Sequence, residues 1–155
     1  LQRRQLLMSL ESVRPGPSIT IRQALLGDLE WVVEAVRSVN QEDLGVELFD
    51  LDGPTLVRKV EASIVSGVEW LGAGRSYRAK VGTLGQYGAQ LGGVWVPPAH
   101  RGRGLGQMGT RALCERLLGE VPVITLHVDA ENLRALRCYE AVGFRAIRDF
   151  QLWVR

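Results

Sequence analysis

The sequence predicts one α/β domain in which helices cover both faces of a mixed sheet. Short alternating or apolar runs indicate strands, and segments with apolar residues at helical spacing indicate helices between them. Along the 155 residues these segments give the order β-α-α-β-β-β-α-β-α-β. With 46% hydrophobic and 23% charged residues, the composition is that of a globular protein, and the length excludes a second full domain.

The first 17 residues are expected to lie outside this domain. Pro15-Gly16-Pro17 separates them from Ile19-Thr20-Ile21-Arg22, whose alternation of apolar and polar residues predicts the first strand. We therefore expect an N-terminal extension, or the remnant of a preceding segment, over residues 1–17. The domain itself is expected over residues 18–155. The patch Leu6-Leu7-Met8 is too short for the core of a signal peptide.

Two helices and three strands follow in the prediction. The apolar spacing predicts one helix over residues 28–39 and a second that begins at Asp52-Gly53-Pro54. Three β-rich runs, separated by glycine-bearing turns, then predict an antiparallel meander over residues 68–71, 76–81 and 87–96.

Two further helices and two strands complete the pattern. We predict a helix over residues 104–118 that Gly119 ends, a short buried strand over 123–128, a helix over 131–142 and a final strand over 150–154.

The turn before the third helix has the composition of an anion site. Arg101 and Arg103 alternate there with Gly102, Gly104 and Gly106, and the turn opens directly into an amphipathic helix. The first N–H groups of a helix have no internal partner, and the aligned peptide dipoles add a partial positive charge at that end. Arginine also matches the geometry of phosphate oxygens. The predicted ligand is therefore a phosphate or a pyrophosphate.

The same turn contains a G-x-G-x-x-G pattern, which makes a dinucleotide-binding protein one alternative. The pattern runs from Gly104 to Gly109, and Asp129 follows 20 residues later, as that fingerprint requires. However, residues 97–103 separate the glycines from the strand, and only 26 residues remain after Asp129. A Walker A loop is excluded because no Gly-Lys-Ser/Thr follows.

Two motifs in register resemble the signatures of the Gcn5-related N-acetyltransferase (GNAT) family. Residues 101–106, Arg-Gly-Arg-Gly-Leu-Gly, fit the acyl-CoA loop R/Q-x-x-G-x-G/A and follow the strand Val94-Trp95-Val96-Pro97. Asn132 to Phe144 fit the second signature, N-x-x-A-x-x-x-Y-x-x-x-G-F. The resemblance is strong over residues 87–150 and only topological before them. It implies a GNAT-like, mostly antiparallel central sheet with helices on both faces.

The resemblance implies acetyl-CoA as the co-substrate and no metal. The pyrophosphate would lie on the amides of Gly102 to Gln107, and the pantetheine arm would pair with Val94 to Val96, where the sheet splays. Gly92-Gly93 would supply the bulge that opens this edge. The implied cofactor-binding residues are Val94, Trp95, Val96, Arg101, Gly102, Arg103, Gly104, Leu105, Gly106, Gln107, Asn132 and Tyr139. For Asn132, capping of the following helix is an equal alternative.

The implied reaction is direct attack of a primary amine on acetyl-CoA. Tyr139 would be the general acid that protonates the departing thiolate. The general base is unassigned because residues 89–94 contain no carboxylate, whereas many family members have a Glu there. Glu42, Asp43 and Glu47, expected in the loop between the first two helices, are weak candidates. The missing carboxylate motivates a second alternative, a non-catalytic acyl-CoA-binding or regulatory module.

The expected partner is a small-molecule or peptide amine, and the acidic Glu42, Asp43, Asp50 and Asp52 hint at a cationic one. The spread of the arginines gives no footprint for nucleic acid, and no apolar stretch reaches the ~20 residues that cross a bilayer. Two cysteines without disulfide or metal spacing predict a reduced, cytoplasmic protein. A homodimer is also expected, since the final strand of this family often pairs between subunits.

Overall fold

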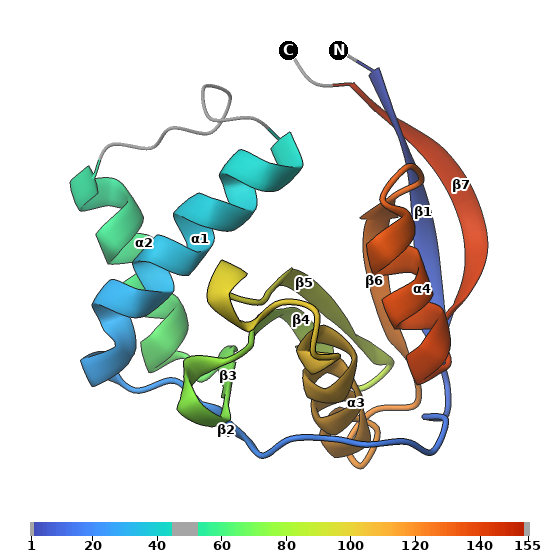
Figure 1. Ribbon diagram of the computed structural model, residues 1–155, viewed down its shortest axis with the longest axis horizontal. Helices are drawn as coiled ribbons and strands as arrows, with labels where there is room; N and C mark the ends of the chain where they lie inside the picture. Colours follow the sequence, from blue (N-terminus) through green and yellow to red (C-terminus); the bar gives the residue numbers. More distant parts are fainter. Residues whose placement is uncertain (1, 45–52, 154–155) are drawn as a thin grey trace.

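The computed structural model describes residues 2–44 and 53–153, which form one seven-stranded sheet with helices on both faces (Figure 1). The strand order is β2-β3-β4-β5-β6-β1-β7. In chain order the main elements are β1 (Gln2–Leu10), β2 (Ile21–Gln23), α1 (Leu29–Leu44), α2 (Gly53–Val65), β3 (Glu69–Gly72), β4 (Arg78–Gly85), β5 (Gly88–Trp95), α3 (Leu105–Leu117), β6 (Ile124–Asp129), α4 (Leu133–Val142) and β7 (Arg145–Trp153).

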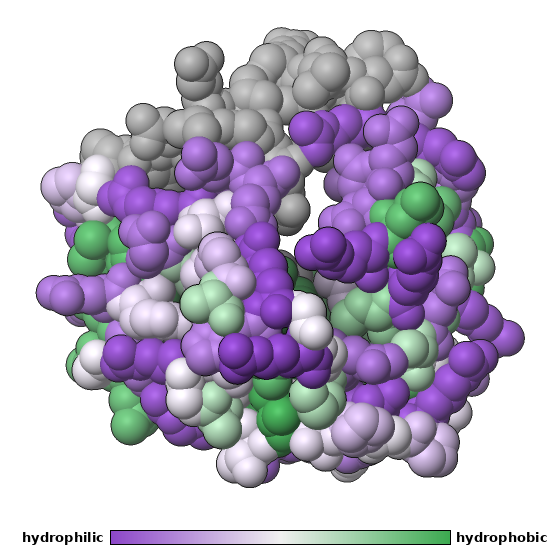
Figure 2. All heavy atoms as spheres, in the orientation of Figure 1, coloured by the Kyte–Doolittle hydropathy of each residue, from purple (hydrophilic) through white to green (hydrophobic). Residues whose placement is uncertain are grey.

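Among the described strands, only β5 and β6 pair in parallel, and this pairing is short. It runs from Ala89 opposite Ile124 to Leu91 opposite Leu126. All other neighbours are antiparallel, which confirms the predicted α/β class and the meander from β3 to β5. Because the ladder stops at Leu91, the two strands diverge beyond it, and Figure 2 shows the molecule hollowed between the α1 side and the α4 side.

The predicted element order was wrong in omitting β1. This strand lies inside the sheet, antiparallel to both β6 and β7, with Met8 and Leu10 buried in the core. The alternation of Leu6, Met8 and Leu10 is the signal that indicates a half-buried strand. Residues 2–10 therefore belong to the sheet. The origin of residues 1–17 as the remnant of a preceding segment stays a prediction.

The last strand is longer than predicted and begins at Arg145 instead of residue 150. β7 forms one edge of the sheet, and the side chains from Arg145 to Asp149 are all exposed. An edge strand without a buried face has no clear alternation, so its N-terminal half gave no pattern to detect.

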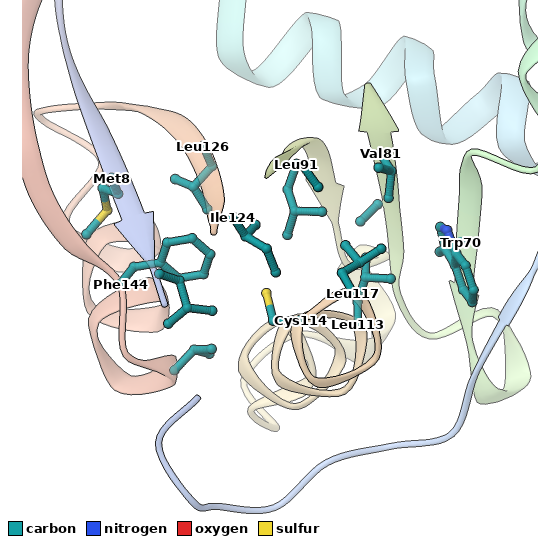
Figure 3. Close-up of a cluster of buried hydrophobic side chains, with 14 of the residues drawn as sticks. Met8, Trp70, Val81, Leu91, Leu113, Cys114, Leu117, Ile124, Leu126 and Phe144 are labelled. Carbon is teal, nitrogen blue, oxygen red and sulfur yellow. The ribbon is translucent and has the colours of Figure 1, made fainter. Parts of the chain in front are cut away.

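Two apolar cores hold the helices on opposite faces of the sheet. In the larger core, Leu113, Cys114 and Leu117 of α3 point toward the sheet residues Val81 and Leu91 (Figure 3). The smaller core lies beneath α1 and α2 and comprises the buried residues Ala24, Val32, Leu56, Val60, Ile64 and Leu71. The diverging strands β5 and β6 both contribute to the larger core, for example through Leu91 and Leu126. In the described part of the chain, no helix combines the length and the apolar character that a membrane span needs.

Candidate active site

A bulge in β5 lies where the sheet opens. Opposite the two-residue step from Arg78 to Lys80 of β4, β5 advances by three residues, from Gly92 to Trp95. Gly93 has φ +58°, a left-handed conformation that strongly favours glycine. The bulge predicted at Gly92-Gly93 is therefore present, immediately after the last β5–β6 pair.

A buried ion pair holds this bulge. Arg78 donates from Nε and Nη2 to the Glu69 carboxylate at 2.8 and 2.7 Å, and from Nη1 to the carbonyl oxygen of Gly93 at 3.0 Å. Arg78 is 3% exposed and Glu69 is 1% exposed. A Cβ on Gly93 would overlap the Arg78 guanidinium. This ion pair was not predicted from the sequence. A charged residue inside each of two strand-like runs could have indicated it, because buried charges are usually paired.

A first cavity of about 590 Å³ opens between the diverging strands. Its lining includes Gly92 to Val94 of β5, His127 to Asp129 of β6, and Arg3 to Gln5 of β1. Asn132 and Tyr139, which come from the second motif, complete it on the α4 side. Three of the predicted cofactor-binding residues, Val94, Asn132 and Tyr139, therefore meet at one cavity.

The α4 residues of this cavity are held by local contacts. Asn132 is the N-cap of α4, and its Oδ1 accepts a hydrogen bond from the Ala135 N–H at 3.1 Å. The Tyr139 ring lies edge-on to Phe144, with the ring centroids 5.9 Å apart. Helix capping by Asn132 is thus observed, whereas its bond to the cofactor stays a prediction.

The Trp95 side chain lies elsewhere. It is buried and packs edge-on against Trp31 of α1, with the ring centroids 5.8 Å apart. Its Nε1 has no hydrogen-bond partner within the described residues. Any contact of Trp95 with a cofactor would therefore come from its backbone, as the sequence analysis expected.

The glycine loop, residues 101–106, leads directly into α3. Gly102 and Gly104 have φ of +81° and +76°, and Gly104 is the N-cap of α3 without a side-chain capping bond. Leu105, Gly106 and Gln107 form the first turn, whose N–H groups have no partner within the helix. This arrangement leaves the positive end of α3 open to an anion.

The two arginines of this loop differ in their contacts. Arg101 donates from Nε to the Val96 carbonyl at 2.9 Å and from Nη2 to the Glu42 carboxylate at 2.8 Å. Arg103 is exposed and has no hydrogen-bond or ion-pair partner among residues 2–44 and 53–153. Arg101 thus ties the loop to β5 and α1, and Arg103 is the arginine that remains available for a phosphate.

The structure changes the setting of the weak base candidates. Glu42 and Asp43 lie in the last turn of α1, and not in the loop after it, while Glu47 falls outside the described residues. Glu42 lines the first cavity but is ion-paired with Arg101. The Arg101 guanidinium thus occupies one of the two carboxylate oxygens of Glu42. The general base therefore stays unassigned.

A second cavity of about 570 Å³ lies on the α1/α2 face of the sheet. It meets the first cavity at Leu91, Gly92 and Gly93, so the bulge is shared between the two. Its lining comes from α1, α2 and strands β3 to β5, which explains why no local motif predicted it. One molecule held on each side would have its nearest atoms at the bulge.

The dinucleotide alternative is not favoured by this fold. Only one parallel strand pair is present among the described strands, whereas a dinucleotide fold needs a mostly parallel sheet. The last glycine of the pattern, Gly109, has a packing role, because a Cβ there would overlap the ring of the buried Tyr77.

Comparisons with known proteins give a consistent result. The model of the family described as FR47-like protein matches residues 72–154. A mycothiol acetyltransferase of a Nocardioides species is 29% identical over 93% of this chain and 56% of the relative. The chain thus spans about half the length of the curated relatives that it matches over most of its own length.

Solved structures resemble the whole chain. An acetyltransferase from the GNAT family of Colwellia psychrerythraea aligns with a TM-score of 0.74 and 15% identity, covering 99% of this chain and 56% of that chain. A spermidine N-acetyltransferase from Vibrio cholerae, in complex with CoA and spermine, aligns with a TM-score of 0.65 and 19% identity, covering 81% and 80%. At these identities the two structures establish the fold.

Proposed function

Because the chain belongs to the Gcn5-related N-acetyltransferase family, we propose that it transfers an acetyl group from acetyl-CoA to an amine by direct attack. The observation that carries this proposal is the bulge at Gly92 and Gly93. Two cavities meet there, one lined by Asn132 and Tyr139 of the α4 motif, the other on the α1/α2 face. Such an arrangement brings two reactants together in one orientation.

The described residues fit a coenzyme A thioester. The open N-terminus of α3, with left-handed Gly102 and Gly104 and with Arg103 unpaired among the described residues, suits a pyrophosphate. Beyond Leu91, the β5 backbone is no longer paired with β6, so Val94 to Val96 have backbone groups for the pantetheine amides, apart from the Val96 carbonyl that accepts from Arg101. When bound, acetyl-CoA supplies the activated acetyl group as a thioester.

The residues of the chain would then have separate tasks. Backbone N–H groups at the bulge would polarise the thioester carbonyl. Tyr139, on the wall of the first cavity, would donate its phenolic proton to the CoA sulfur as the thiolate departs. The amine would approach from the second cavity. The predicted homodimer stays a prediction; the position of β7 at the edge of the sheet supports it.

Neither cysteine is needed as a nucleophile. Burial raises the pKa of the Cys138 thiol to about 11, so at pH 7 only about one thiol in ten thousand is ionised. Burial raises the pKa of Cys114 as well. We therefore expect Cys138→Ser to retain the rate of acetyl transfer within about twofold. An acetylated Cys138 in a quenched reaction, detected by mass spectrometry, would contradict direct attack.

Calorimetric titration with acetyl-CoA tests the cofactor site. We expect Arg103→Ala to weaken binding by about 10- to 100-fold, because a hydrogen bond between charged groups contributes about 1.5–3 kcal/mol. Arg148→Ala, on the exposed edge strand β7, is the matched control and should bind like the wild type. NADH is the ligand control.

The outcomes separate the alternatives. Folded protein that does not bind acetyl-CoA would overturn the proposal, and binding of NADH in its place would revive the dinucleotide alternative. Acetyl-CoA binding without transfer to any member of a broad amine panel would favour the non-catalytic acyl-CoA-binding module. Binding that depends on Arg103, together with transfer to an amine, supports the proposal.

A further inference from the structure

The second cavity contains both lysines of the chain. Lys59 of α2 and Lys80 of β4 line it, and every other strongly basic side chain in the 155 residues is an arginine. Lys80 lies opposite Gly92 in the β4–β5 register, beside the bulge. Lysine differs from arginine in presenting a compact, freely rotating ammonium group. The two lysines therefore lie on the α1/α2 face, from which the amine would approach the bulge.

These two charges are uncompensated within the described structure. The other charged residues that line the cavity, Glu69 and Arg78, neutralise each other through the buried ion pair. The ammonium groups of Lys59 and Lys80 have no hydrogen-bond or ion-pair partner among residues 2–44 and 53–153. The described lining therefore carries a net charge of two positive units, from Lys59 and Lys80.

This charge selects among amines. A positive lining repels polyamines, which carry several ammonium groups, and attracts a carboxylate or phosphate. It also disfavours the ammonium form of the reacting amine, since a nearby like charge lowers an amine pKa. The neutral amine, which is the nucleophile, then forms more readily without a carboxylate base. Of the acidic residues that hinted at a cationic acceptor, Glu42 is ion-paired with Arg101, while Asp50 and Asp52 lie outside the described residues.

We infer that the acceptor is an amine that also carries an anionic group, a carboxylate or a phosphate, held by Lys59 and Lys80. This inference rests on the proposed acetyl transfer and specifies its substrate class. The reacting amine would lie at the Gly92-Gly93 bulge, and the anionic group would lie toward the two ammonium groups. The side chains of Asn40 and Gln90 also line the cavity. They are neutral hydrogen-bonding groups, so they repel neither the amine nor the anionic group of such an acceptor.

Matched pairs of amines test the inference. Amino acids are compared with their amides, and aminoalkyl phosphates with the corresponding amino alcohols, with spermidine as a cationic acceptor. We expect kcat/KM to be at least tenfold higher for the anionic member of one pair. Which pair shows the preference distinguishes a carboxylate from a phosphate. Lys80→Gln and Lys59→Gln should each reduce the preference several-fold, while Lys80→Arg retains most of it.

Two controls keep the result specific. Arg148→Gln removes one positive charge from the distant strand β7 and should leave the preference unchanged. A binding measurement is independent of turnover: the rate at which acetic anhydride modifies Lys59 and Lys80, read by mass spectrometry, should fall when the N-acetylated form of the preferred amine, which does not consume the reagent, is present. Equal use of both members of every pair, or a preference for spermidine, would overturn the inference while acetyl transfer stands. Absence of transfer to any amine would instead overturn the proposed function.

Discussion

Glu69→Leu is expected to destabilise the protein by about 3–5 kcal/mol, because it leaves the Arg78 guanidinium buried without a counter-charge. The double variant Glu69→Leu/Arg78→Met should recover most of this loss, since apolar residues of similar volume often replace a buried ion pair without cost. Urea unfolding measures both. The control is Asp149→Ala, which breaks the exposed Arg4–Asp149 pair and should cost less than about 1 kcal/mol.

The same double variant separates stability from catalysis. It removes the hydrogen bond from Arg78 Nη1 to the Gly93 carbonyl, which holds the bulge where the two cavities meet. We expect kcat to fall about tenfold or more although the protein is folded, since misplacement of reacting groups is costly to rate. A stable double variant with wild-type kcat would show that Arg78 only supports the fold. If the free energy of unfolding of Glu69→Leu lies within about 1 kcal/mol of the wild-type value, the ion pair is not needed for stability either.

Tyr139→Phe is expected to lower kcat by about 100-fold or more, the usual contribution of a positioned general acid. The affinity for acetyl-CoA and the stability should change little, because phenylalanine keeps the edge-on ring contact with Phe144. Steady-state kinetics and calorimetry provide the two measurements. Tyr87→Phe, at a tyrosine that is 79% exposed, is the matched control and should behave like the wild type.

Varying the leaving group of the acetyl donor tests whether Tyr139 acts as a proton donor. A thioester whose thiol has a low pKa needs no proton to depart, so the defect of Tyr139→Phe should shrink with an aryl thioester donor. An equal defect with both donors would indicate that Tyr139 orients the co-substrate and does not donate a proton. Wild-type turnover with acetyl-CoA would remove its catalytic role.

Much of the fold was predictable because its signals are local. The helix predicted over residues 104–118 is observed as Leu105–Leu117, since glycines mark both of its ends. The bulge at Gly92-Gly93 also followed from adjacent glycines. β1 was missed although Leu6, Met8 and Leu10 alternate, because its partner strands β6 and β7 are distant in the sequence and no local feature indicates the pairing.

The candidate site was likewise predictable only where its residues are close together in the sequence. The loop from Arg101 to Gln107 and Tyr139 were identified because each lies in a contiguous motif. The pairing of Glu69 with Arg78, and the convergence of Lys59 and Lys80 on one cavity, depend on strand register and helix docking. Neither quantity can be read from residue spacing alone. The ion pair between Arg101 and Glu42 likewise depends on how α1 docks on the sheet, so the sequence alone did not predict it.

The place of β1 in the sheet also affects how the chain folds. Its first residues pair with the last strand, as in the hydrogen bond between Arg4 and Asp149, which joins positions 145 residues apart. The pairing of β1 with β7 therefore cannot form until the chain has been synthesised through the β7 residues that reach Trp153. Closing so large a loop is entropically costly and slows folding. The wall that β1 gives to the first cavity, and the burial of Met8 and Leu10, thus depend on strands that lie more than 100 residues further along the chain.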